Sequence, residues 1–334
     1  MNVIVDAMGG DNAPHAIVEG CILGLRQNKA LNIILVGRQE LIDAELKKHK
    51  YNKQRIEVVN ATEVIGMAEA PVDALRNKKD SSVVVGLRLL KEGRGGVFIS
   101  AGSTGAVIAG ATLIVRRMKK VKRPGLAAVL PTKKGGVLLM DCGASVECRA
   151  SFLAQFALMG SIYMEQVGGV KNPRVGLVNN GAEAEKGSDL TKEAYKQIEK
   201  TPVNFAGNAE GRDFFSGDFD VLVTDGFTGN IVLKNTEGLA SFLMYTLKKE
   251  LKNSLRNKIG AKLAMPAFQG FKKSLDYTEY GGGLLLGING GVIKAHGSSN
   301  AKAIGSTLRQ ASEFISGDVV GKIREKISKI SLDD

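Results

Sequence analysis

The residues of this chain best suited to chemistry stand in five glycine-rich segments, each directly after a run of apolar residues. The segments are 6–11, 100–105, 141–145, 179–181 and 225–230. Glycine lets backbone N–H groups approach a ligand closely, and N–H groups at a helix start bind anions. Because loops at the carboxyl ends of parallel strands share one edge of an open α/β sheet, we expect all five to form one composite site.

The segment 101–106 is the strongest candidate for an anion site. Two glycines and two hydroxyls precede the apolar residues of an expected helix that continues through 114–115. Exposed amides and hydroxyls there would hold a phosphate group. The alternative is that the glycines serve only a tight turn between strand and helix.

Gly9 and Gly10 also follow a strand, but they match neither the dinucleotide motif nor the P-loop motif, so neither nucleotide class is indicated.

Two further side chains could serve such a site. Lys186 lies in a polar loop after the fourth of these apolar runs and could neutralise a phosphate, although most loop lysines are simply solvated. His296 stands between an apolar pair and Gly-Ser-Ser, where a ligand could reach it, with a structural role as the alternative. Cys142 ends a strand but has no base nearby, so we expect an apolar filler and not a nucleophile.

The elements that would position these loops alternate between strands and helices. Apolar runs of strand length occupy residues 3–6, 33–36, 56–59, 97–100, 126–130, 137–141, 175–178 and 221–225. Helical stretches separate most of them. This alternation is typical of a doubly wound, mostly parallel sheet covered by helices on both faces, which is a three-layer α/β/α fold. The runs 127–130 and 136–140 are too close for a helical crossover and indicate an antiparallel pair.

Residues 235–275 differ in character from the rest of the chain. Leucine or isoleucine recurs every four residues from Leu239 to Leu263, with lysine and arginine between. This spacing drifts around a 3.6-residue helix, so one straight helix would not keep the stripe on one face. We expect two helices, broken near Gly260 and joined by the apolar tip 263–268. They form either a core-facing pair or a projecting amphipathic hairpin for dimerisation or membrane contact.

The composition excludes several classes of protein. With 334 residues and 44% hydrophobic content, the chain could form two domains, with a boundary near residue 230, or one large domain. Because there is no linker or repeat, we expect a single catalytic domain over residues 1–334. The net charge of +12 favours an acidic partner, such as nucleic acid, an acidic protein, a phosphorylated substrate or an anionic membrane surface. Three cysteines and three histidines without a C-x-x-C motif indicate a reduced, cytoplasmic setting and no metal site. We expect no signal peptide and no membrane-spanning segment.

Several of these segments together resemble the bacterial phosphate acyltransferase family of phospholipid synthesis. They are residues 5–11, 13–14, 100–106, 123–124, 223–230 and 293–299. The resemblance implies a homodimer without a cofactor, with a fold similar to that of phosphotransacetylase and isocitrate-type dehydrogenases. It implies reversible transfer of a long-chain acyl group from the thioester of acyl carrier protein to inorganic phosphate. The acyl phosphate would pass to a membrane glycerol-phosphate acyltransferase.

The resemblance also suggests roles for residues at matching positions. Lys186 with the glycine-rich amides would hold phosphate, and Asn230 or the amides of 226–229 would stabilise the carbonyl oxygen as it gains charge. His296 would donate a hydrogen bond or a proton to the departing thiolate. The residues expected to bind substrate or phosphate are Asp6, Gly9, Gly10, Asp11, Gly102, Ser103, Thr104, Gly105, Asp141, Asn180, Asp225, Gly226, Thr228 and Gly229. At Ser145 the family usually has asparagine, so an amide contact there would be replaced by a hydroxyl contact or lost.

The positive charge then fits two expected partners. Acyl carrier protein is strongly acidic, and the apolar tip could touch an anionic membrane surface, so we expect a cytoplasmic protein with peripheral membrane attachment. The candidate basic surfaces are 119–123 and the basic residues of 239–273. The alternative enzymes are a phosphotransacetylase for short-chain acyl-CoA and a nicotinamide dehydrogenase, which the loop spacing disfavours. A basic lipid- or nucleic-acid-binding protein is the non-enzymatic alternative; 5% aromatic residues and no Trp argue against nucleic acid.

Overall fold

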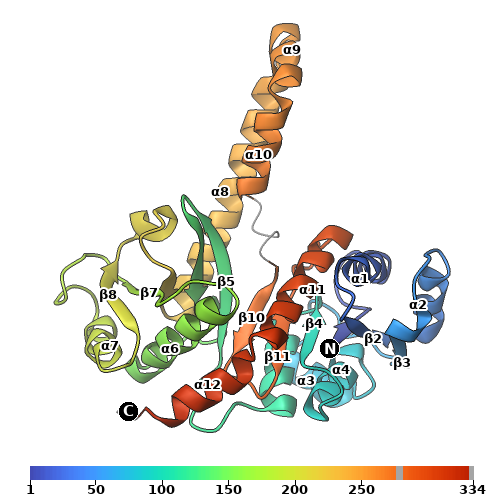
Figure 1. The fold of residues 1–334 in the computed structure, drawn as a ribbon, viewed down its shortest axis with the longest axis horizontal. Helices are drawn as coiled ribbons and strands as arrows, with labels where there is room; N and C mark the ends of the chain where they lie inside the picture. The colour runs from blue at the N-terminus through green and yellow to red at the C-terminus, as the bar shows by residue number, and fades with distance from the viewer. Residues whose placement is uncertain (276–280, 331–334) are drawn as a thin grey trace.

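The computed structural model describes residues 1–275 and 281–330 and folds them around one mixed sheet (Figure 1). The strands are β1 (Asn2–Asp6), β2 (Asn32–Gly37), β3 (Ile56–Asn60), β4 (Val97–Ser100), β5 (Gly125–Thr132), β6 (Gly135–Met140), β7 (Arg174–Val178), β8 (Asn204–Ala209), β9 (Val221–Val223), β10 (Gly283–Leu286) and β11 (Gly291–Lys294). Their order in the sheet is β3-β2-β1-β4-β11-β10-β5-β6-β9-β7-β8.

Helices cover both faces of this sheet, which confirms the three-layer α/β/α fold. They are α1 (His15–Gln27), α2 (Gln39–Leu46), α3 (Pro71–Asn77), α4 (Ser82–Lys91), α5 (Thr104–Gly110), α6 (Ala150–Gln166), α7 (Asp189–Glu199), α8 (Gly226–Lys252), α9 (Leu255–Leu263), α10 (Met265–Leu275), α11 (Ala301–Ser316) and α12 (Val319–Ser328). On one face of the sheet, a core lies beneath α1, α2, α6, α7, α11 and α12. On the other face, α3 to α5 and the first residues of α8 pack against the sheet. Because successive side chains of a strand point to opposite faces, Val3 and Val5 of β1 are buried in the first core and Ile4 is buried in the core on the other face.

The sheet consists of two parallel sets of strands that run in opposite directions. Strands β3, β2, β1, β4 and β11 form one set, and β6, β9, β7 and β8 form the other. Between the sets, β11, β10, β5 and β6 pair antiparallel in succession, so the strand direction reverses. The expected antiparallel pair, β5 with β6, is thereby confirmed. The prediction that all five glycine-rich loops share one sheet edge is wrong.

The strand register nevertheless brings the carboxyl ends of the two sets to nearly the same level. Lys294, the last residue of β11, pairs with Gly283 of β10. The next residue of β10, Leu284, pairs with Ala127 of β5, and Ala127 pairs with Met140, the last residue of β6. Loops from both sets therefore converge over β10 and β5, although they come from oppositely directed strands.

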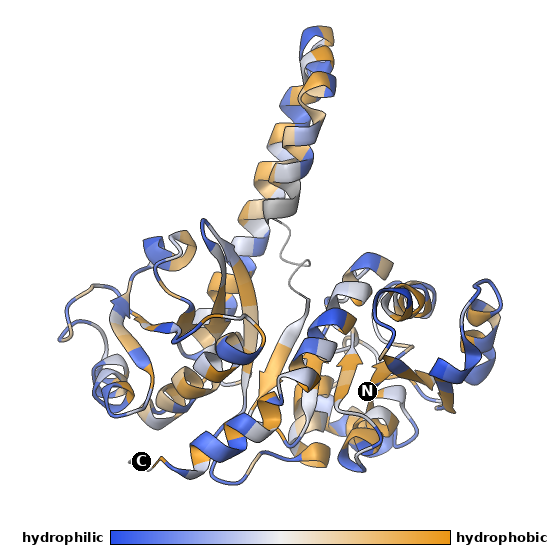
Figure 2. Cartoon of the chain, in the orientation of Figure 1, coloured by the Kyte–Doolittle hydropathy of each residue, from blue (hydrophilic) through white to orange (hydrophobic). Residues whose placement is uncertain are grey.

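Helices α8 to α10 project from the sheet as a helical hairpin (Figure 1). Helix α8 leads outward, the short α9 lies at the far end and α10 returns beside α8. The junction between α9 and α10, at Ala264, lies within the predicted tip 263–268, but Gly260 is inside α9 and an additional break occurs at residues 253–254. Ser254 causes this additional break, because its hydroxyl accepts a hydrogen bond from the Asn257 N–H at 3.0 Å and so starts a new helix. Figure 2 shows apolar and polar residues mixed along the whole projection.

Candidate active site

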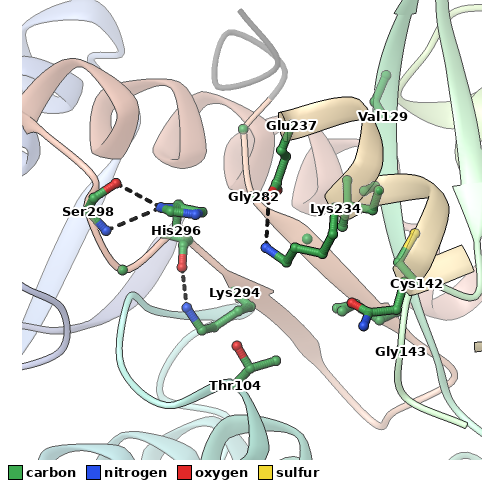
Figure 3. Close-up of a pocket in the computed structure, with 18 of the residues that line it drawn as sticks. Thr104, Val129, Cys142, Gly143, Lys234, Glu237, Gly282, Lys294, His296 and Ser298 are labelled. Atoms are coloured by element: carbon green, nitrogen blue, oxygen red, sulfur yellow. Dashed lines mark hydrogen bonds and ion pairs between the residues drawn. The ribbon is translucent and has the colours of Figure 1, made fainter. Parts of the chain in front are cut away.

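A cavity of about 440 Å³ lies where the loops of the two strand sets converge. The first strand set contributes Asp11, Thr104, Lys294, His296 and Ser298 to its lining, and β5, β6 and α8 with their loops contribute Leu126, Ala128, Val129, Cys142, Gly143, Asn230, Leu233, Lys234 and Glu237. Figure 3 shows Lys294 and His296 on one side of this cavity and Lys234 and Glu237 of α8 across from them. We call the two sides the α5 wall and the α8 wall.

Lys294 brings a positive charge into the α5 wall. Its Nζ donates hydrogen bonds to the carbonyl oxygen of Ala101, at 3.3 Å, and to that of Ala295. Burial lowers the pKa of Lys294 to about 8, while the nearby carboxylates of Asp6 and Asp11 oppose this shift. The side chain is therefore mostly charged at neutral pH and lies beside the loop that leads into α5.

Helix α5 begins at Thr104 without a side chain that caps its N-terminus. Helices α1, α2, α3 and α6 also lack a capping side chain, whereas Ser81, Ser188, Asp225 and Asn300 cap α4, α7, α8 and α11. What sets the start of α5 apart is that Thr104 lines the cavity beside Lys294. Backbone N–H groups at an uncapped helix start are hydrogen-bond donors with a partial positive charge. The α5 wall therefore combines a lysine with a helix start suited to an anion.

Asp6 holds the loops after β1 and β4 together beneath this wall. The carboxylate is 1% exposed; Oδ1 accepts from the Met8 N–H at 3.0 Å, and Oδ2 accepts from the Ser100 hydroxyl at 2.6 Å. The same hydroxyl accepts from the Gly102 N–H at 3.0 Å. Burial raises the pKa of Asp6, and its hydrogen bonds oppose the rise. These contacts give Asp6 a positioning role.

Gly9 and Gly10 let three loops touch at the α5 wall. A Cβ on Gly9 would lie 2.6 Å from the backbone nitrogen of Gly102, and one on Gly10 would lie 2.8 Å from the carbonyl oxygen of Gly297. Gly10 also has φ +96°, which other residues rarely adopt. The Asp11 N–H donates to the Gly297 carbonyl oxygen at 2.8 Å. These glycines thus serve close loop packing, and the packing places Asp11 at the cavity.

The α8 wall is built where α8 starts against the loop after β6. Asp225 caps the helix: Oδ1 accepts from the Thr228 N–H at 2.9 Å and Oδ2 from the Thr228 hydroxyl at 2.7 Å. A Cβ on Gly229 would lie only 1.8 Å from the carbonyl oxygen of Asp141, so this position requires glycine. This close approach places the next residue, Asn230, in the cavity lining.

Asp141 organises the loop after β6 in the way that Asp6 organises the loops opposite. Its carboxylate is fully buried, and burial raises its pKa. Oδ1 accepts from three backbone N–H groups at 2.9 to 3.1 Å, those of Leu126, Gly143 and Ala144. The loop therefore has a fixed shape before any ligand arrives.

Two other residues of this loop answer questions that the sequence raised. The Ser145 hydroxyl accepts from Arg123 Nε at 3.0 Å, so of the two outcomes expected at this position the structure has the hydroxyl contact. The Cys142 thiol is 2% exposed and lies 3.2 Å from the Leu139 carbonyl oxygen. Burial raises the pKa of this thiol, which agrees with an apolar filler and not with a nucleophile.

His296 is an exposed side chain at the edge of the α5 wall. Its Nδ1 accepts from the backbone N–H of Ser298 at 3.3 Å and lies 2.8 Å from the hydroxyl of the same residue. Because Nδ1 accepts, the proton of the neutral ring is on Nε2. The ring can therefore donate a hydrogen bond through Nε2.

The structure brings together only part of the predicted site. Asp11, Thr104, Asn230 and His296 line the cavity, whereas Lys186 and Asn180 do not. Lys186 lies in the loop after β7, where its N–H donates to the Glu183 carbonyl oxygen at 3.1 Å. The remaining predicted residues lie in the segments that shape the two walls: Asp6, Gly9, Gly10, Gly102, Ser103, Gly105, Asp141, Asp225, Gly226, Thr228 and Gly229. Their direct contact with a ligand stays a prediction, as does the role of Lys186.

Three charged residues of the cavity were missed by sequence reasoning. Lys294 ends the buried strand β11, and a lysine at the end of an apolar run was the available signal. Lys234 and Glu237 lie four and seven residues after Asn230, on the same side of α8, and form an ion pair at 2.7 Å. The helical spacing from a residue already singled out could have indicated both.

Comparison with solved structures shows which known proteins share this fold. The structure matches that of a phosphotransacetylase from Streptococcus pyogenes with a TM-score of 0.62 and 17% identity, covering 94% of both chains. EutD phosphotransacetylase from Staphylococcus aureus gives a TM-score of 0.58 at 16% identity, again over 94% of both chains. At these identities the likeness shows the fold alone, which is that of the phosphotransacetylases.

Sequence comparison identifies the family. The family model described as "Fatty acid synthesis protein" matches residues 1–322. The phosphate acyltransferase of Clostridium botulinum (strain ATCC 19397 / Type A) is 51% identical over 330 residues, which cover 99% of this chain and 98% of the relative. That of Clostridium novyi (strain NT) is 49% identical over 329 residues, or 98% of this chain and 99% of the relative. The chain belongs to the phosphate acyltransferase family and is an acyltransferase of fatty-acid and lipid synthesis.

Proposed function

We propose that this acyltransferase moves a long-chain acyl group reversibly from the thioester of acyl carrier protein to inorganic phosphate. The product, acyl phosphate, would be handed to a membrane glycerol-phosphate acyltransferase for the synthesis of phosphatidic acid and phospholipids. One observation carries the proposal: the uncapped start of α5, Lys294, Asn230 and His296 meet around one cavity. An anion, a carbonyl group and a leaving thiol each find a suited partner among these groups.

Phosphate is bound at the α5 wall in this proposal. The N–H groups at the start of α5 donate to its oxygens, and the Lys294 ammonium offsets its charge. The contact of Lys294 with the Ala101 carbonyl oxygen keeps this charge next to the helix start. A phosphate held there is oriented toward the α8 wall, and orientation of a nucleophile lowers the barrier by several kcal/mol. Lys186 is proposed as a further cation for the phosphate, subject to test.

The thioester carbonyl is placed at the α8 wall. A phosphate oxygen attacks the carbonyl carbon, the new C–O bond forms, and the C–S bond breaks as the sulfur takes the electron pair. Asn230 donates a hydrogen bond to the carbonyl oxygen while that oxygen carries negative charge. The Nε2–H of His296 donates a hydrogen bond to the sulfur as it takes the electron pair, and a thiolate is a good leaving group, so this step needs little help.

The projecting hairpin is proposed to serve the homodimer and to touch an anionic membrane surface. It exposes large apolar side chains, among them Leu255 at 76% and Leu263 at 81%. The net charge of +12 is complementary both to anionic lipid and to an acidic carrier protein. No helix among the described residues is long and apolar enough to cross a membrane. We expect the double variant Leu255→Asp, Leu263→Asp to lose sedimentation with anionic vesicles; unchanged sedimentation would remove the membrane contact from the proposal.

The proposed function is tested by phosphate-dependent thiol release from palmitoyl-acyl carrier protein, with palmitoyl-CoA and acetyl-CoA in parallel. Release from the carrier substrate with formation of acyl phosphate is expected. The fold shared with phosphotransacetylases makes transfer from short-chain acyl-CoA the second candidate, and release from acetyl-CoA alone would select it. No release from any donor would contradict both.

A further inference from the structure

A second, mainly apolar cavity of about 490 Å³ adjoins the candidate active site. It lies between the β5–β6 pair and α8. Its lining includes the apolar residues Leu130, Phe215, Leu239, Ala240 and Leu243. Leu233 and Glu237 line both cavities, so the two spaces share a wall.

One face of β5 runs through both cavities. Leu126 and Ala128 line the first cavity, and Leu130 and Thr132 line the second. Alternate residues of a strand point to the same side, so these four positions form one continuous row. From the first to the last, the strand rises about 20 Å.

Helix α8 follows the same path. Asn230, Leu233 and Glu237 line the first cavity, and Leu233, Glu237, Ala240 and Leu243 line the second. Spacings of three and four residues place these positions on one side of the helix. The side that carries Asn230 thus continues outward as an apolar surface.

The polar groups at the junction are paired with each other. Glu237 borders both cavities, and its carboxylate forms an ion pair with Lys234 at 2.7 Å. Leu233 provides apolar surface between Asn230 and the second cavity. An uncharged chain that passes the junction therefore need not break a hydrogen bond to protein.

We propose that this acyl track, formed by Leu126, Ala128 and Leu130 of β5 and Leu233, Ala240 and Leu243 of α8, binds the fatty acyl chain of the substrate. The carbonyl group lies at Asn230 and the methyl end points toward Leu243. This inference rests on the proposed function, because it takes the substrate to be an acyl donor. A saturated chain fits this lining because it has no polar group to satisfy. Leu239 and Leu243 are 50% and 43% exposed, so the acyl track is open to solvent on this side, and a bound acyl chain would cover them.

The test compares two tryptophan variants on adjacent residues of α8. Ala240→Trp fills the middle of the acyl track, whereas Ser241→Trp adds the same side chain at an exposed position outside both cavities. Phosphate-dependent thiol release is measured with octanoyl- and palmitoyl-acyl carrier protein. Each buried methylene contributes about fourfold in affinity, equivalent to about 0.8 kcal/mol. We expect Ala240→Trp to lower kcat/KM for palmitoyl at least about 100-fold more than for octanoyl, and Ser241→Trp to keep the wild-type ratio.

A binding measurement separates this inference from the proposed function. The fluorescent fatty acid cis-parinarate is titrated into each protein and displaced with palmitate. Wild type and Ser241→Trp should bind it, and Ala240→Trp should not. Leu243→Asp, at the outer end of the track, serves as a second variant if Ala240→Trp does not fold. Loss of probe binding without turnover of any donor would support the track and remove the proposed function.

Two results would overturn the inference. One is equal loss, or no loss, of octanoyl and palmitoyl turnover in both Ala240→Trp and Leu243→Asp. The other is a changed oligomeric state of Ala240→Trp in light scattering, together with unchanged probe binding. In that case the surface is an interface with a second copy of the protein and does not bind the acyl chain.

Discussion

The starts of α5 and α8 are alike in sequence and different in structure. Both follow a buried strand through a glycine-rich segment, residues 102–105 in one case and 226–229 in the other. Asp225 caps α8, whereas no side chain caps α5. A helix start that already holds a carboxylate repels a second anion, which supports our proposal that phosphate binds at α5 and the thioester carbonyl lies at the wall built on α8. Among the uncapped helix starts, that of α5 is the one with its first residue, Thr104, and a lysine, Lys294, in the lining of this cavity.

The largest effect is expected from giving α5 the cap that it lacks. Ser103 stands at its N-cap position, and Ser103→Asp would place a carboxylate where we propose phosphate. Like charges brought together cost several kcal/mol, so the KM for phosphate should rise about 10³-fold while the melting temperature stays at or above that of wild type. Ser103→Asn is the uncharged control and should raise the KM much less. An unchanged phosphate KM in Ser103→Asp would break the comparison.

The next effect concerns the α8 wall. Removing a hydrogen-bond donor that stabilises a developing oxyanion lowers kcat about 10²- to 10³-fold, and we expect this of Asn230→Ala. The KM for phosphate should change little, because Asn230 stands across the cavity from α5. Initial rates at varied phosphate and saturating acyl donor measure both constants. A rise in phosphate KM with normal kcat would mean that phosphate binds at the α8 wall, which contradicts the proposal.

A smaller effect is expected from pH. The pKa of Lys294 is about 8, so its charge is present below that pH and is lost as the pH rises through it. The charged fraction falls about tenfold for each further pH unit, and phosphate KM should rise by about tenfold near pH 9. Lys294→Arg is the control, because arginine stays charged in this pH range and only the ionisation of phosphate itself then changes. The phosphate KM of this variant should therefore rise less with pH than that of wild type. Identical profiles for the two proteins would exclude Lys294 from phosphate binding.

The smallest effect concerns the cap of α8. Loss of a capping side chain costs about 1 kcal/mol of unfolding free energy, which we expect for Asp225→Ala in urea denaturation. Asp225→Asn keeps a capping acceptor and should cost less. Phosphate KM should stay at its wild-type value in both, because the carboxylate serves the helix. A lowered phosphate KM in Asp225→Ala would show that the start of α8 also attracts the anion.

Most strands could be predicted because their residues are buried on both faces and form apolar runs. Of the other three strands, β11 (Gly291–Lys294) was seen only as an apolar pair before His296, and two were missed because their apolar runs are absent or very short. β8 (Asn204–Ala209) is an edge strand with a half-exposed, polar sequence, and β10 (Gly283–Leu286) has four residues between glycines. The additional break in the projecting hairpin was missed because the leucine spacing says nothing about Ser254, whose hydroxyl starts α9.

The candidate site was predictable where a local motif carries it. Thr104, Asn230 and His296 each belong to a glycine- or serine-rich segment, and all three line the cavity. Lys294 lies in the segment 293–299, two residues before His296, but it ends an apolar strand and was not singled out. It reaches the α5 wall only because β11 lies between β4 and β10, a pairing of strands nearly 200 residues apart in the chain that no local pattern reveals. The reversal of strand direction across β10 and β5 was hidden for the same reason.

A crystal structure of the protein grown with inorganic phosphate would test the central claim most directly. The account predicts phosphate at the start of α5, held by the backbone N–H groups near Thr104 and by the Lys294 ammonium. Phosphate bound instead at the start of α8, or in the loop of Lys186 with the α5 wall empty, would contradict it.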